Sequence, residues 1–95
     1  MNLEEEKIRF CENVRELRLA LGLSVIEFST ITHTSVYAIE ALNDRRITGE
    51  LGVSFLFHLA RKFQVEPATF LSPMSKQEIE RLALQYKNRK MLRCD

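Results

Sequence analysis

The chain has 95 residues, of which 45% are hydrophobic and 28% charged, and its formal net charge is +1. This length predicts one domain with a single modest core. The near-neutral charge gives little support for a nucleic-acid partner, because strong nucleic-acid binders are often clearly basic. Glycine and proline are sparse and no long alternating β-branched run occurs, so the composition predicts an all-α fold.

The sequence also disfavours membrane and metal-binding proteins. No apolar run approaches the roughly 20 residues that cross a bilayer, so we expect no membrane association. The first six residues, MNLEEE, are acidic and unlike a secretory leader, which predicts a cytoplasmic protein. Cys11 and Cys94 are far apart with no histidine cluster nearby, so we expect neither a metal site nor a cofactor. We expect a buried Cys11 and a solvated Cys94, with a disulfide as the alternative.

The first helix is expected over residues 3–21. Its apolar residues recur every three or four positions and form one face: Phe10, Val14, Leu17 and Leu21. Gly22 follows directly and is the expected C-terminal cap, because a left-handed backbone is least costly for glycine.

The segment LGLSVIEFSTITHTSVYAIEAL, residues 21–42, predicts two short helices joined by a tight turn. Ser24 and Glu27 have the spacing of a capping box, in which each side chain bonds the other residue's backbone N–H. This pair predicts that the first of the two helices spans about residues 25–32.

The second helix of the pair is expected over about residues 35–43, and either Thr34 or Ser35 can cap it. Its apolar stripe consists of Val36, Ile39 and Leu42. A helix, a short turn and a second capped helix at this scale are typical of a helix-turn-helix unit, here residues 24–43.

Three more helices are predicted in the remainder of the chain. A polar loop at residues 44–50 precedes a helix over about 51–63, and we expect both Phe55 and Phe57 to enlarge its buried surface. Pro67 suits the first turn of a short fifth helix that ends near Leu71.

A sixth helix is expected over about residues 75–92. Ser75 and Glu78 form a second potential capping box at its start. The apolar stripe of this helix either packs on the other helices or meets its copy in a dimer, and the sequence leaves both possibilities open.

An ordered set of residues resembles a known family. The set comprises the run ELRLALGLS at residues 16–24, the helix pair that follows, and Leu56, Leu59, Ala60, Arg61, Lys62, Phe63, Val65, Phe70 and Leu71. With this set, residues 10–72 resemble the phage-repressor and Cro-like (XRE-type) family of helix-turn-helix DNA-binding domains. The resemblance implies a five-helix, lambda-repressor-like bundle at residues 1–73. The sixth helix then belongs to a C-terminal extension, residues 74–95.

The resemblance further implies a sequence-specific transcriptional regulator that binds double-stranded DNA as a homodimer. The second helix of the unit would enter the major groove, while the first would cross above the DNA backbone. The positions that would face bases are Val36, Tyr37 and Ala41, with Glu40 beside them. The positions that would lie near phosphates are Val25, Thr34, Ser35, Arg45 and Arg46.

The base-facing residues depart from the usual chemistry of base reading. Arginine, lysine, glutamine and asparagine donors normally match purine edges, whereas Val36 and Ala41 offer only apolar contact to thymine methyl groups. Glu40 can accept a hydrogen bond from cytosine but repels phosphate. Sequence reading would therefore depend on methyl contacts, on Tyr37 and on DNA shape.

A further departure concerns Arg18, which the family pairs with a glutamate at the end of the third helix. The matching position here is Asn43. We therefore expect a hydrogen bond from Arg18 to this amide, or a pair with Asp44 or Glu40, with a solvated Arg18 as the alternative.

A second hypothesis is a protein-interaction module, antitoxin-like or an adaptor, that keeps the fold but reads DNA weakly. Its apolar contact patch would consist of Val25, Ile26, Val36 and Tyr37. We do not expect an enzyme, because the sequence has no recognisable catalytic constellation and its two histidines, His33 and His58, belong to different helical regions.

Overall fold

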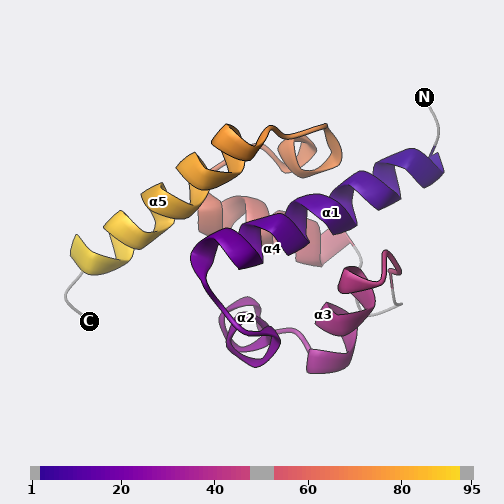
Figure 1. Cartoon of the computed structure of the whole chain (residues 1–95), viewed down its shortest axis with the longest axis horizontal. Helices are drawn as coiled ribbons and strands as arrows, with labels where there is room; N and C mark the ends of the chain where they lie inside the picture. Colours follow the sequence, from indigo (N-terminus) through magenta and orange to yellow (C-terminus); the bar gives the residue numbers. More distant parts are fainter. Residues whose placement is uncertain (1–2, 48–52, 93–95) are drawn as a thin grey trace.

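The computed structural model describes residues 3–47 and 53–92, and every regular element in these ranges is a helix. The elements are α1 (Leu3–Leu21), α2 (Val25–Thr32), α3 (Val36–Asn43), α4 (Val53–Phe63), the 3₁₀ helix η1 (Pro67–Leu71) and α5 (Lys76–Leu92) (Figure 1). The expected all-α class is therefore confirmed for the described residues. None of these helices is long and apolar enough to span a membrane.

Helix α1 begins and ends as its sequence indicates. Its first turn contains three glutamates, whose charge is favourable at the positive end of the helix dipole. At the other end Gly22 has a φ of +72°, and its N–H donates to the Leu19 carbonyl at 3.0 Å. A residue with a Cβ would be strained at this φ, so the expected role of Gly22 as a helix stop is confirmed.

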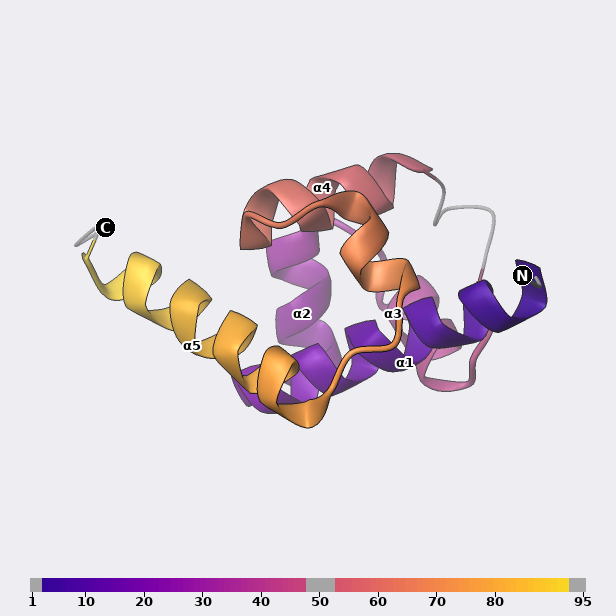
Figure 2. The same cartoon turned by 90° about the horizontal axis from the view of Figure 1, so that it is seen from above.

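The core is organised around the apolar stripe of α1. The predicted residues of this stripe, Phe10, Val14, Leu17 and Leu21, are all buried. Helix α5 lies on one side of α1, and α2 and α3 lie on the other side (Figures 1 and 2). Residues from these elements, from α4 and from η1 complete the core: Cys11, Phe28, Ala38, Ile39, Leu42, Phe55, Leu59, Phe63, Phe70, Ile79, Leu82 and Ala83. Cys11 is a free, buried thiol, and Cys94 lies outside the described residues.

One buried polar side chain ties α1 to η1. Asn13 is 5% exposed, and its Nδ2 donates to the carbonyls of Phe70 and Ser72, each at 2.9 Å. These two carbonyls lie where η1 ends, so the amide replaces hydrogen bonds that a continuing helix would have supplied.

One expectation for the segment between residues 51 and 71 needs correction. Phe55 is buried, but Phe57 is 54% exposed. Two residues advance a helix by about 200°, so neighbours at this spacing cannot both face the core. The predicted short fifth helix is present as the five-residue 3₁₀ helix η1. It ends at Leu71, and Ser72 follows in an extended conformation just before Pro73. The first two residues of the predicted helix over 51–63 lie outside the described ranges.

Helix α5 packs on the rest of the protein, which was one of the two possibilities left open by the sequence. The Ser75 Oγ accepts from the Glu78 N–H at 3.1 Å, and the Glu78 carboxylate accepts from the Ser75 N–H at 3.4 Å, so the predicted capping box is formed. Ile79, Leu82 and Ala83 are buried against the core, which settles how the inner side of the helix is used. The outer side remains exposed.

We predict that Asn13→Ala lowers the free energy of unfolding by about 1–3 kcal/mol, because it leaves buried carbonyl oxygens without their donor. Urea unfolding followed by circular dichroism measures this loss. The matched control is Asn88→Ala on the exposed side of α5, which should change stability by no more than about 0.5 kcal/mol. Equal midpoints for the two variants would contradict the role given to Asn13.

Candidate nucleic-acid interface

The helix pair α2–α3 starts at a well-formed cap. The Ser24 Oγ accepts from the Glu27 N–H at 3.1 Å, and the Glu27 Oε1 accepts from the Ser24 N–H at 2.9 Å. The predicted capping box is therefore confirmed. Hydrogen bonds from the backbone and then the side chain of Ser24 lower the pKa of Glu27, so the cap keeps a charged carboxylate at the start of α2.

The turn between α2 and α3 consists of the three residues that follow Thr32. His33 ends α2 in the left-handed conformation, with φ 55° and ψ 43°. The N–H of Thr34 then returns to the Ser29 carbonyl at 3.0 Å, and its hydroxyl donates to the Thr32 carbonyl at 3.1 Å. Ser35, rather than Thr34, caps α3 by accepting from the Ala38 N–H at 3.1 Å.

Helix α3 has a sharply divided surface. Its inner side is buried and consists of Ala38, Ile39, Ala41 and Leu42. On the other side Tyr37 is 58% exposed, Glu40 is exposed and Val36 is half-buried. A helix advances by about 100° per residue, so these three side chains share one outward face. The leading half of α3 is therefore accessible to a partner.

The expectation that Ala41 faces bases is wrong. Ala41 is 1% exposed and lies on the core side of α3. On a helical wheel, Ala41 is about 40° further from Val36 than Tyr37 is. This rotation is enough to turn its single methyl group towards the core. Its methyl group cannot contact a duplex in this fold.

The two arginines after α3 are both exposed, and each is ion-paired. The guanidinium of Arg45 lies 3.2 Å from the Glu12 carboxylate of α1, and that of Arg46 lies 3.5 Å from the Asp44 carboxylate. All four side chains are about half exposed or more. Such pairs contribute little to stability and exchange readily for another anion. The pair to Glu12 was not anticipated, because nothing local in the sequence indicates it.

Arg18 does not make the expected contact with the end of α3. Its guanidinium donates to the Leu23 carbonyl at 2.8 Å, and its Nε is buried without a hydrogen-bond partner in the described structure. The nearby backbone therefore takes the place of Asn43, Asp44 and Glu40. Arg18 closes the turn between α1 and α2 instead of bracing α3.

Helix α2 exposes one large apolar side chain beside the polar Glu27 and Thr30. Ile26 is 66% exposed, which is the largest exposure among the big hydrophobic side chains of the described residues. Val25, which the family resemblance places near a phosphate, is half-buried and packs against the core. The side chain of Val25 is therefore poorly accessible to a partner, whereas the side chain of its neighbour Ile26 is accessible.

The structure brings together two histidines that the sequence assigns to different helical regions. The rings of His33, at the end of α2, and His58, on α4, lie edge to face with centroids 5.7 Å apart. The Nε2 atom of His58 is buried and has no hydrogen-bond partner among the described residues. Desolvation lowers the pKa of His58 below its ordinary value, and the nearby charges of Lys62, His33 and Arg61 lower it further.

Comparison with known proteins adds no further constraint on this surface. The chain matches no protein-family model, no curated protein and no solved structure. Within the described residues, no group of three or more histidine, cysteine or acidic side chains is arranged to hold a metal ion. The α2–α3 surface itself is therefore the basis for assigning a function.

We predict that the protein becomes less stable as the pH falls below about 6.5, the ordinary pKa of histidine. Because the pKa of His58 is lowered in the folded state, the unfolded chain binds this proton more readily, and stability rises with pH across this window. Urea unfolding between about pH 7 and about pH 5 measures the effect.

The variant His58→Gln isolates this contribution, since carboxylates also begin to titrate at the acidic end of the range. It should show a weaker loss of stability than the unmodified chain over the same interval. His33→Asn, which keeps a residue tolerant of the left-handed turn, should weaken the dependence only in part. Identical pH dependence in the unmodified chain and His58→Gln would refute the assignment.

Proposed function

We propose that this protein is a sequence-specific DNA-binding regulator of the helix-turn-helix type, which presents α3 to the major groove and acts as a homodimer. The observation that carries the proposal is the divided surface of α3. Its inner side is fixed in the core, and its capped leading half exposes Tyr37. The resemblance of residues 10–72 to the phage-repressor and Cro-like family supports the same assignment.

The dimensions of α3 suit this role. An α-helix with its side chains is about 10–12 Å across, which fits the major groove of B-form DNA, about 12 Å wide. The turn that precedes α3 is held by the left-handed His33 and by the Ser35 cap, so the helix is presented in a fixed orientation. A preorganised helix loses little conformational entropy when it binds.

The chemistry of the outward face defines how bases would be read. The hydroxyl of Tyr37 can donate to or accept from a base edge, Val36 can contact a thymine methyl group, and Glu40 can accept from a cytosine amine. Only Tyr37 among these supplies a hydrogen-bond donor. Sequence-dependent DNA shape therefore carries much of the proposed specificity.

The phosphate contacts in this proposal come from Arg45 and Arg46 at the end of α3. Arg45 would exchange its carboxylate partner, Glu12, for a phosphate when DNA binds. The exchange costs little because the ion pair is exposed to solvent. It leaves Glu12 close to the DNA backbone, so this carboxylate limits the affinity for any duplex, whatever its sequence.

We predict that Tyr37→Ala lowers affinity for the preferred duplex about tenfold, while binding to random duplex changes little. The preferred sequence is first selected from a random duplex library with the unmodified protein, and fluorescence anisotropy then compares the variants. Tyr37→Phe separates the hydroxyl from the ring, and Gln85→Ala on α5 is the control. Selection that enriches no sequence, together with salt-insensitive binding, would count decisively against DNA reading.

We predict that Arg45→Ala and Arg46→Ala each weaken binding to all duplexes and reduce the slope of log affinity against log salt by about 1. Glu12→Gln should have the opposite effect on affinity, because it removes a negative charge beside the phosphates and frees Arg45. Arg81→Ala, on α5 and away from α2 and α3, is the charge-matched control. If the slope of log affinity against log salt were equal in all four variants, Arg45 and Arg46 would not contact phosphates in the complex.

A protein-interaction module is the second candidate, and the exposure of Ile26 favours it. The helix pair exposes two large side chains, Ile26 on α2 (66%) and Tyr37 on α3 (58%), and such side chains suit contact with a protein partner. Ile26→Ser distinguishes the two candidates. Its DNA affinity should stay unchanged under the first proposal, whereas an antitoxin-like or adaptor role requires this substitution to abolish partner binding.

A further inference from the structure

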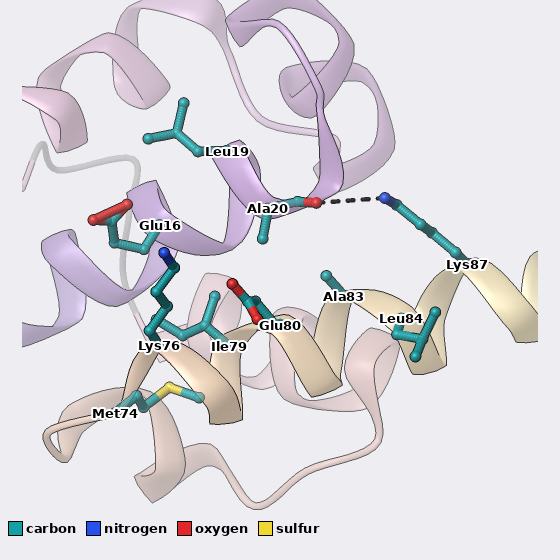
Figure 3. Close-up of a pocket in the computed structure, with 10 residues that line it drawn as sticks. All are labelled: Glu16, Leu19, Ala20, Met74, Lys76, Ile79, Glu80, Ala83, Leu84 and Lys87. Carbon is teal, nitrogen blue, oxygen red and sulfur yellow. Dashed lines mark hydrogen bonds between the residues drawn. The ribbon is translucent and has the colours of Figure 1, made fainter.

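A groove runs between the second half of α1 and the part of α5 up to Lys87 (Figure 3). Helix α5 lies across α1 from α3 (Figure 1). Its volume is about 850 Å³. The apolar part of its lining comes from both helices and includes Leu19, Ala20, Ala83 and Leu84. Its charged part has both signs: Glu16 on α1, and Lys76, Glu80 and Lys87 on α5. The proposed DNA-binding surface does not include any of these residues.

Two large hydrophobic side chains line this groove without being covered. Leu19 is 48% exposed and Leu84 is 58% exposed. Single exposed leucines are common on protein surfaces and need no explanation. Here the two leucines border one groove on adjacent helices, so a partner that entered it would bury both of them together.

The charges along α5 indicate what kind of partner fits. Glu80, Leu84 and Lys87 follow one another at intervals of four and three residues, so they lie along one side of the helix. Ala83 lies between them on the same side. Between Glu80 and Lys87 the stripe therefore carries an acid at one end, a base at the other and an apolar centre, and Lys76 lies one turn before the acid.

We propose that the groove receives α5 of a second copy of this chain, in an antiparallel two-fold pair centred between Ala83 and Leu84. In this arrangement Glu80 lies as far before the centre as Lys87 lies after it. Glu80 of each copy therefore faces Lys87 of the other, and the two-fold axis produces this ion pair twice. The exposed Leu84 of each copy meets the apolar centre of the other groove.

The orientation follows from the same charges. A parallel pairing of the two helices would bring Glu80 against Glu80 and Lys87 against Lys87, and like charges opposed in this way are destabilising. Lys87 is available for the new contact, because its present hydrogen bond to the Ala20 carbonyl is long, at 3.4 Å, and exposed (Figure 3). An unrelated partner would have no reason to match this self-complementary order.

This inference gives a surface to the homodimer named in the proposed function, but its test requires no DNA. The pairing leaves α2 and α3 uncovered, since they lie across α1 from α5 (Figure 1). Failure of self-association in the absence of DNA would overturn the pairing alone. Failure of DNA binding by a chain that still forms dimers would overturn the proposed function alone.

Sedimentation equilibrium of the full chain, over a range of concentrations, is the first measurement. The unmodified protein should approach twice its monomer mass of 11.1 kDa as its concentration rises. Leu84→Glu places a charge in the apolar centre and should raise the dimer Kd roughly a hundredfold. Gln85→Glu adds the same charge next along α5, outside the groove lining, and should leave the Kd unchanged.

Charge exchange tests the antiparallel register. Glu80→Lys and Lys87→Glu each oppose like charges at two symmetric positions and should raise the Kd about tenfold. The double variant, Glu80→Lys with Lys87→Glu, restores both ion pairs and should return the Kd to that of the unmodified chain. Circular dichroism confirms that every variant remains helical.

Two results would overturn the proposal. The first is an unmodified chain that remains monomeric at every concentration, which would leave the groove to a different partner. The second is a dimer that persists in Leu84→Glu, or one in which the double charge exchange is no better than the single variants. Either form of the second result would place the dimer contact elsewhere on the surface.

Discussion

The burial of one apolar stripe on α1 is the constraint on which the structure depends. A chain of 95 residues can build only one modest core, so the elements must share a common partner. Phe10, Val14, Leu17 and Leu21 supply it, and α3, η1 and α5 all pack against this helix. Each of these elements therefore keeps one side towards α1 and turns its other side towards solvent. The outward face of α3 is a direct consequence of this sharing.

The same constraint separates the two candidate surfaces. Because α1 lies between them, α3 and the α1–α5 groove occupy different sides of the molecule. A partner bound at one surface does not obstruct the other. Both surfaces nevertheless include residues of α1, which supplies Glu12 to the ion pair with Arg45 and Leu19 to the groove. Substitutions on α1 therefore need to be interpreted at both surfaces.

Local signals in the sequence predicted most of the helix boundaries. The Ser24 and Ser75 caps and the Gly22 stop depend on neighbouring residues only, so spacing was sufficient to find them. Contacts between distant segments were beyond that reasoning. The burial of Ala41 depends on how far α3 is rotated against its neighbours, and the ring contact of His33 with His58 depends on how α2 meets α4. Periodicity fixes which residues share a face, but tertiary packing decides how far each face is covered.

Because the outward face of α3 has few hydrogen-bond donors, the proposed DNA binding depends energetically on the proposed dimer contact. A single copy of α3 offers Tyr37 as its main donor, and the two nearby arginines are already paired with carboxylates. One such surface would bind DNA mainly through phosphates, in the range of about 10⁻⁴ to 10⁻⁶ M that is typical of nonspecific binding. Two surfaces joined by a two-fold pair convert the second contact into an intramolecular one, and affinity can then rise about 10²–10⁴-fold without any new side chain. A DNA-binding helix with few donors therefore depends more on its dimer contact than one with several bidentate arginines. Loss of the Leu84 contact should then weaken the proposed DNA binding at least as much as loss of Tyr37, although the two residues lie on different surfaces.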